Sequence, residues 1–135
     1  MIYKKLQIHD IDQVIEIFRH DNLKYVTGEY PGKEWIIEFV NNGHAYGLYE
    51  NDIVKAAVVG ENILGNGCYL WLIAVKSEDI GKGYGQILLS NFEESMKEMG
   101  KKWIFLTSFD KSENFYKRNN YISNGLIVKE FCKSF

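Results

Sequence analysis

Three glycines at alternate positions, Gly81, Gly83 and Gly85, precede an apolar run with helical spacing in the stretch from Asp79 to Leu89. Glycines leave main-chain N–H groups uncovered, and the first N–H groups of a helix have no partner within that helix. The helix dipole adds partial positive charge at the same point. The pattern therefore favours a site for an anion such as phosphate or pyrophosphate. A tight turn with close helix–strand packing is the alternative explanation.

The amino-acid sequence of this loop excludes two common phosphate-binding motifs. A P-loop requires Ser or Thr directly after its lysine, whereas Lys82 is followed by Gly83. The dinucleotide-binding fingerprint requires a third glycine at position 86, which Gln86 occupies.

Length and charge indicate one globular domain that spans residues 1–135. The formal charge of -2 gives no electrostatic reason to expect nucleic acid or an anionic membrane as a partner. No apolar run reaches the roughly 18 residues that a spanning helix needs, and the N-terminus lacks the apolar core of a signal peptide. We therefore expect a cytoplasmic protein with neither a nucleic-acid nor a membrane partner.

Cysteine and histidine usage supports neither a metal site nor a thiol nucleophile. Cys68 and Cys132 form no C-x-x-C pair, and the three histidines are scattered along the chain, so zinc has no ligand set of typical spacing. Cys68 begins an apolar run, where a buried and inert thiol is expected.

Periodicity predicts the order β-α-α-β-β-β-α-β-α-β-β for one α/β domain with a mixed sheet. Strands are expected at 2–8, 44–49, 53–60, 68–75 and 103–107, with a final hairpin within 121–131, and helices at 11–20, 35–40, 84–99 and 112–119. Asp10 is expected to cap the first helix with Gln13 as its capping-box partner, and Gly100 to end the third. The run 68–75 is almost wholly apolar, which is typical of a central strand covered on both faces.

Two segments resemble the signatures of the GNAT superfamily of N-acetyltransferases. V-K-S-E-D-I-G-K-G-Y-G-Q-I-L-L, residues 75–89, is similar to the acetyl-CoA loop that follows a strand ending in valine. Val75 falls on that valine, and Gly83 and Gly85 fall on the two small positions. S-E-N-F-Y-K-R-N-N-Y, residues 112–121, is similar to the second signature, and one helix and one strand separate the two, as in the family.

The chain departs from the family pattern at three positions. Ile80 occupies the usual Gln or Arg position, so the polar contacts of that side chain are missing. Ser112 replaces an alanine, and Asn120 replaces the glycine before the last aromatic residue. Asparagine tolerates the left-handed backbone that glycine adopts there, so we expect the turn to survive.

The resemblance implies a mixed, mostly antiparallel sheet of about seven strands with a central parallel splayed pair, flanked by about four helices. It also implies acetyl-CoA as the acetyl donor, with its pantetheine arm in the gap between strand 68–75 and strand 103–107. The backbones of Ile73 and Val75 would bind this arm, and the N–H of Val75 would also face the thioester oxygen. The implied pyrophosphate site consists of Gly81, Lys82, Gly83, Tyr84, Gly85 and Gln86.

By the same resemblance, Tyr116 would donate a proton to the departing thiolate, and Glu61 is the candidate general base. The acceptor pocket is expected from the loop that contains Tyr25, Glu29 and Tyr30, which suit a small cationic amine. Lys117 and Arg118 are expected on the wet face of the short helix rather than on the cofactor.

The implied activity is transfer of an acetyl group from acetyl-CoA to a primary amine of a small molecule or peptide, by direct attack in a ternary complex. A non-catalytic CoA-binding or protein-interaction module on the same fold is the alternative, and Ile80 is its best support. Members of the family are often dimers, and a homodimer is left open.

Overall fold

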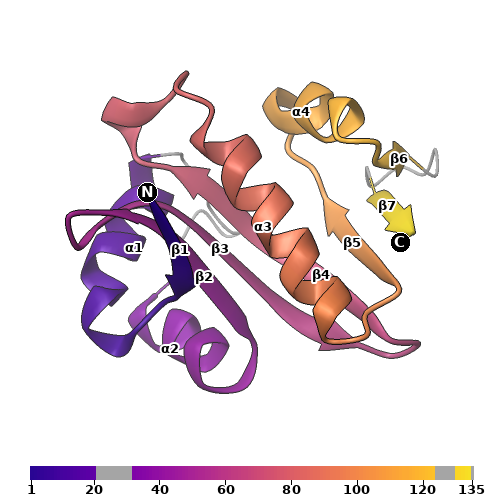
Figure 1. Ribbon diagram of the computed structural model, residues 1–135, viewed down its shortest axis with the longest axis horizontal. Coiled ribbons are helices and arrows are strands. Elements are labelled where there is room, and N and C mark those ends of the chain that lie inside the picture. Colours follow the sequence, from indigo (N-terminus) through magenta and orange to yellow (C-terminus); the bar gives the residue numbers. More distant parts are fainter. Residues whose placement is uncertain (21–31, 124–129, 135) are drawn as a thin grey trace.

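The computed structural model describes residues 1–20, 32–123 and 130–134 as one mixed sheet with helices on both faces (Figure 1). The strands are β1 (Ile2–Lys5), β2 (His44–Glu50), β3 (Ile53–Ile63), β4 (Gly67–Val75), β5 (Trp103–Thr107), β6 (Ile122–Ser123) and β7 (Glu130–Ser134). The helices are α1 (Ile11–His20), α2 (Lys33–Asn42), α3 (Tyr84–Glu98) and α4 (Glu113–Arg118). The expected element order is confirmed.

The strands lie in the order β1-β2-β3-β4-β5-β7-β6, and among these described strands only β4 and β5 run parallel. This confirms the mixed sheet with a parallel pair near its centre. The expectation of about seven strands is met only in part, because β6 has just two residues.

Two hydrophobic layers hold the helices against the sheet. On one face, α1 and α2 bury Phe18 and Ile36 against Val59 of β3. On the other face, α3 buries Phe92 against Val58 of β3 and Ile104 of β5. Successive β3 residues thus belong to opposite layers, as the strand period of two requires. β2 and the middle of β3 are buried on both faces.

A β-bulge at Trp71 divides β4 into two parts. Val59 pairs with Leu72 and the next β3 residue, Gly60, pairs with Leu70, so Trp71 has no opposite residue on β3. The extra residue reverses the faces: Leu70 packs in the α3 layer, whereas Leu72 packs in the α1–α2 layer. The prediction that 68–75 is covered on both faces is therefore wrong at Trp71, which is 41% exposed.

The parallel pairing of β4 with β5 ends where the bulge begins. The paired residues run from Gly67 with Trp103 to Leu70 with Leu106. Residues 71–75 of β4 have no β5 residue paired with them in the described part of the chain. The expected splayed pair is confirmed, and the bulge supplies its physical reason, since an extra residue bends and twists the bulged strand.

The expected cap of the first helix is wrong in its details. Residues 8–10 form a 3-10 turn that leads into α1, and the buried Asp10 accepts hydrogen bonds from the Gln7 N–H at 3.0 Å and the Tyr49 hydroxyl at 2.6 Å. Gln13 does not reach back to Asp10, because its Oε1 accepts from the Val54 N–H at 3.0 Å. The Asp10 carboxylate thus stabilises the turn through Gln7 and also joins the turn to β2 through Tyr49.

Two left-handed residues end α3 and α4 as the sequence predicts. Gly100 has φ 81°, and its N–H donates to the Lys97 carbonyl while the Lys101 N–H donates to the Met96 carbonyl. This pair of hydrogen bonds is the Schellman arrangement expected of a glycine after a helix. Asn120 has φ 68°, so asparagine does take the place of the family's glycine.

The loop between β4 and α3 is anchored by a buried carboxylate. Asp79 is 3% exposed, and its Oδ1 accepts from Lys82 Nζ at 2.8 Å while Oδ2 lies 3.3 Å from Lys55 Nζ on β3. The hydrogen bond from Lys82, with the charge of Lys55, lowers the pKa of Asp79. The same hydrogen bond raises the pKa of Lys82. Asp79 thereby links the loop to the middle of the sheet.

We expect Asp79→Asn to lower the free energy of unfolding at pH 7, because an amide cannot compensate the two lysine charges. The pKa of Asp79 is depressed in the folded state, so its contribution is present above the ordinary aspartate pKa of about 3.9 and is lost as pH falls through the folded value. Urea unfolding from pH 7 downward should therefore show the difference between wild type and variant shrinking in acid.

The matched control is Glu78→Gln, which removes the exposed neighbouring carboxylate that lies 3.2 Å from Lys76. A surface pair of this kind contributes at most about 1 kcal/mol. A deficit in Asp79→Asn that is no larger than the control's, or that does not change with pH, would contradict the assignment.

Candidate functional site

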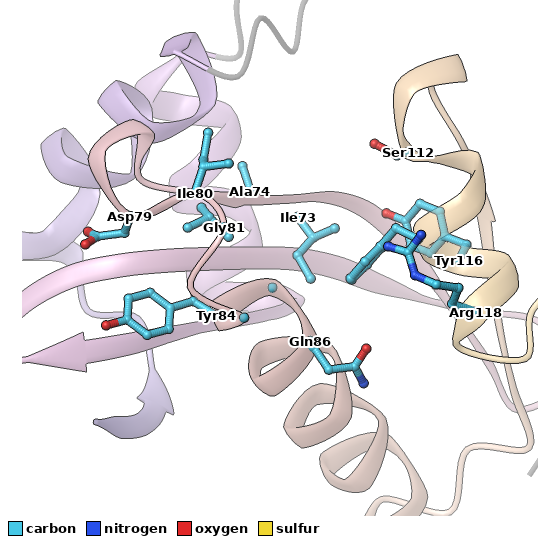
Figure 2. Close-up of a pocket in the computed structure, with 14 residues that line it drawn as sticks. Ile73, Ala74, Asp79, Ile80, Gly81, Tyr84, Gln86, Ser112, Tyr116 and Arg118 are labelled. Atoms are coloured by element: carbon cyan, nitrogen blue, oxygen red, sulfur yellow. The ribbon is translucent and has the colours of Figure 1, made fainter.

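A cavity of about 590 Å³ opens where β4 separates from β5, between the start of α3 and α4 (Figure 2). It is lined by Ile73, Ala74, Val75, Asp79, Ile80, Gly81, Gly83, Tyr84, Gly85, Gln86, Ser112, Phe115, Tyr116 and Arg118. Residues from both sequence signatures therefore meet at one cleft, although residues 90–111 separate the signatures along the chain.

The backbone of β4 forms one wall of this cleft. Ile73 and Val75 are half-buried, and their side chains pack against the α3 layer. Their main chain lies on the stretch that has left β5, so an extended ligand can occupy the position of the missing strand. Both residues line the cleft, and the binding of a cofactor by their backbones stays a prediction.

The three glycines have two different structural tasks. Gly81 and Gly83 have φ 91° and 85°, in the left-handed region where other residues are strained, and a Cβ on either would meet nothing within 4 Å. Gly85 lies in the first turn of α3, where a Cβ would come 3.5 Å from the Val75 side chain and 3.8 Å from Phe115. The first two set the course of the loop, and the third keeps the cleft open.

The start of α3 presents free main-chain donors. Gly83 is the N-cap, and the first hydrogen bond of the helix runs from the Ile87 N–H to its carbonyl. Within the described residues, no hydrogen bond is recorded from the N–H of Gly83, Tyr84, Gly85 or Gln86. Because α3 is 15 residues long, its dipole adds positive potential at these groups. The geometry suits an anion, as the glycine pattern indicated.

The cation at this cleft comes from α4 rather than from the loop. Lys82 does not line the cavity, and its ammonium is held by Asp79. Ile80 lines the cavity with an exposed apolar side chain. Lys117 lies on the wet face as expected, paired with Glu113 at 3.0 Å. Arg118 was placed on the same face by sequence reasoning, but it lines the cleft, and adjacent positions 117 and 118 gave no signal to distinguish them.

Tyr116 of α4 lies at the border between the cleft and a smaller cavity. It is 6% exposed and lines both the large cavity and a smaller one floored by Leu70 and Thr107. Its ring lies 5.7 Å from that of Tyr121, whose hydroxyl donates to the buried Glu93 at 2.7 Å. Burial is the main cause that raises the pKa of Tyr121. This packing places the Tyr116 ring in the hydrophobic layer on the α3 face of the sheet.

Glu61 is not brought to the same cleft. Its Oε1 accepts a hydrogen bond from Trp71 Nε1 at 2.8 Å, and both residues line a separate cavity of about 180 Å³ beside α2. Trp71 also lines the small cavity beneath Tyr116. Glu61 is therefore a neighbour of the cleft through Trp71 and does not line it.

The remaining expectations fall outside this site. Tyr25, Glu29 and Tyr30 lie outside the described residues. Cys68 is fully buried, and burial raises the pKa of its thiol to about 12, which leaves it protonated and inert. Among the described residues, no three His, Cys, Asp or Glu side chains are grouped to hold a metal ion. No helix within the described ranges is long and apolar enough to cross a membrane.

Solved structures with the same fold cover almost the whole chain. The PaiA N-acetyltransferase from Thermoplasma acidophilum, in complex with coenzyme A, superposes with a TM-score of 0.82 at 18% identity over 99% of this chain and 98% of the other. An aminoglycoside 6'-N-acetyltransferase complexed with coenzyme A gives 0.84 at 16% identity over 99% and 97%. The NatC complex bound to Gag peptide and CoA gives 0.81 at 15% identity over 99% and 98%.

Comparison of the sequence itself identifies the family. No curated protein matches the chain. The profile described as the acetyltransferase (GNAT) family matches residues 11–121, which include both signatures and all of the residues that line the cleft. The chain belongs to the GNAT family of acetyltransferases.

Proposed function

We propose that the chain transfers an acetyl group from acetyl-CoA to a primary amine by direct attack in a ternary complex. The observation that carries the proposal is the split between β4 and β5, which opens directly beside the uncovered N–H groups of α3. Solved structures of the same fold contain coenzyme A, which supports acetyl-CoA as the donor here.

The residues of the cleft fit such a donor. The space in front of Gly81 and Gly83 is open, and the free N–H groups of Gly83 to Gln86 can bind the pyrophosphate. Arg118 can add the charge that Ile80 does not supply, while Lys82 contributes only if it leaves Asp79. The open backbone at Ile73 and Val75 can pair with the pantetheine amides, and the Val75 N–H is proposed to face the thioester oxygen. A donor at such an oxygen contributes roughly 3 kcal/mol in comparable sites.

Acetyl transfer to a primary amine also requires two proton transfers, one from the amine and one to the departing thiolate. A primary amine with a pKa near 10.4 is mostly charged at pH 7, which withholds the neutral nucleophile by about 4.6 kcal/mol. Acetyl-CoA supplies the acetyl group as an activated thioester. We propose that Tyr116 gives its phenolic proton to the departing sulfur. Glu61 stays the candidate base, and because it lines a neighbouring cavity it would act through water.

A non-catalytic CoA-binding or protein-interaction module is the second candidate. Ile80 in the place of a polar residue favours it, whereas the buried Tyr116 at the inner end of the cleft favours catalysis. Three further statements stay predictions from the sequence. They are the nature of the acceptor as a small molecule or peptide, the cytoplasmic location and the possible homodimer.

The donor site is tested by thermal shift with acetyl-CoA, with NAD and ATP as competing candidates. Acetyl-CoA at 100 times its dissociation constant should stabilise the protein by about 2.7 kcal/mol. Gly85→Leu should abolish this stabilisation, because a side chain there projects between Val75 and Phe115. Gly85→Ala is the matched control and should keep it, since a single Cβ makes only ordinary contacts. Equal stabilisation of both variants would contradict the placement of the donor.

Tyr116→Phe tests proton donation separately from binding. Loss of a general acid should lower kcat about 100-fold, while the dissociation constant of acetyl-CoA should change by less than about twofold. Turnover is measured with a panel of amines. Tyr121→Phe is the control: it loses a buried hydrogen bond to Glu93, at a cost of about 1–3 kcal/mol in stability, and should keep most of kcat. Undiminished turnover of Tyr116→Phe would remove this tyrosine from the mechanism, and binding without any turnover in wild type would favour the module.

A further inference from the structure

The cavity beside α2 that contains Glu61 has walls of unusual composition. Its volume is about 180 Å³, and it is lined by Trp35, Glu38, Phe39, Asn42, Gly43, Glu61 and Trp71. The two indoles are 6.0 Å apart and nearly perpendicular, at 85°. Trp71 is 41% exposed, so part of its indole is accessible to a ligand.

Each of the two carboxylates accepts a hydrogen bond that orients it, and neither is paired with a cation among the described residues. Glu38 Oε1 accepts from Asn42 Nδ2, and Glu61 Oε1 accepts from Trp71 Nε1, each at 2.8 Å. Neither carboxylate takes part in an ion pair among the described residues. The cavity therefore combines two negative charges with two aromatic faces, which together suit an organic cation.

This cavity and the cleft are neighbours that both border the same small hollow in the sheet. Trp71 lines both it and the small cavity beneath Tyr116, and that small cavity shares Ile73 and Tyr116 with the cleft. The cleft lies on the α3 face and this cavity on the α2 face, so the two open on opposite sides of the sheet. At about 3.3 Å per strand residue, Trp71 is roughly 7 Å from Ile73 and roughly 13 Å from Val75.

We propose that this cavity binds a positively charged group of the acceptor. The acceptor then carries two cationic centres: one is held by Glu38, Glu61 and the two indoles, and the other loses its proton and attacks the thioester roughly 7–13 Å away. This inference rests on the proposed acetyl transfer and narrows its acceptor to diamine-like molecules or peptides with a second positive charge.

The test compares linear diamines with monoamines of equal carbon number, from butyl to octyl, as acceptors with acetyl-CoA. We expect kcat/KM for the preferred diamine to exceed that of its monoamine at least about tenfold. Glu38→Gln should raise KM for the diamine by about tenfold and leave the monoamine unaffected. Glu34→Gln, an exposed glutamate at the start of α2 that lines none of these cavities, is the matched control.

Glu61→Gln separates binding from general base catalysis. A binding role raises KM for diamines only, whereas a base lowers kcat for diamines and monoamines alike. Tryptophan fluorescence titration with the same amines gives a readout that does not depend on turnover, because both indoles line the cavity.

The outcomes distinguish the two proposals. Selective diamine turnover that is lost in Glu38→Gln supports both. Saturable diamine binding by fluorescence without any acetylation would support the cation site and end the proposed transfer. Equal use of monoamines and diamines, or unchanged kinetics in Glu38→Gln, would overturn the cation site while leaving the transferase intact. Neither binding nor turnover would overturn both.

Discussion

The short ladder between β4 and β5 is the constraint on which the rest of the structure depends. Pairing ends at Leu70 and Leu106, and the bulge at Trp71 turns the remainder of β4 away. A main chain that leaves its partner exposes N–H and C=O groups that need another partner. The donor cleft and the position of Tyr116 in its lining both follow from this one separation. The hydrophobic layers on both faces keep the two halves of the sheet together despite it.

The anion site is prepared before any ligand arrives. Left-handed glycines set the loop, Asp79 anchors the loop to Lys55 on β3, and α3 supplies aligned donors. Lys82 is engaged in holding the loop, so the positive potential at the cleft comes from main-chain groups, the helix dipole and Arg118 of α4. A site of this kind needs little reorganisation when an anion binds, which reduces the entropic cost of association.

Local signals in the sequence were sufficient for the element order and the glycine loop, whereas the parallel pair was expected from the resemblance to the family. Helix periodicity, the glycine after α3 and the asparagine at 120 act within a few residues, so sequence alone could place them. The failures involve distant partners. Asp10 bonds Tyr49, Gln13 bonds Val54, and Asp79 pairs with Lys55, none of which is adjacent in sequence. The bulge could not be predicted, because an apolar run has no alternation of polar and apolar residues that an extra residue would interrupt. Arg118 could not be distinguished from Lys117, because their helix has only six residues.

The chemistry of this fold rests on groups that carry little sequence information, since main-chain donors can be supplied by many residue types. The most direct measurement is amide-resolved NMR of the protein titrated with acetyl-CoA. If the diphosphate lies on α3 and the pantetheine along β4, the largest shifts will fall on the amides of Gly83 to Gln86 and of Ile73 and Val75. Shifts concentrated on another face, or amides of this loop that stay unperturbed at saturation, would contradict the account.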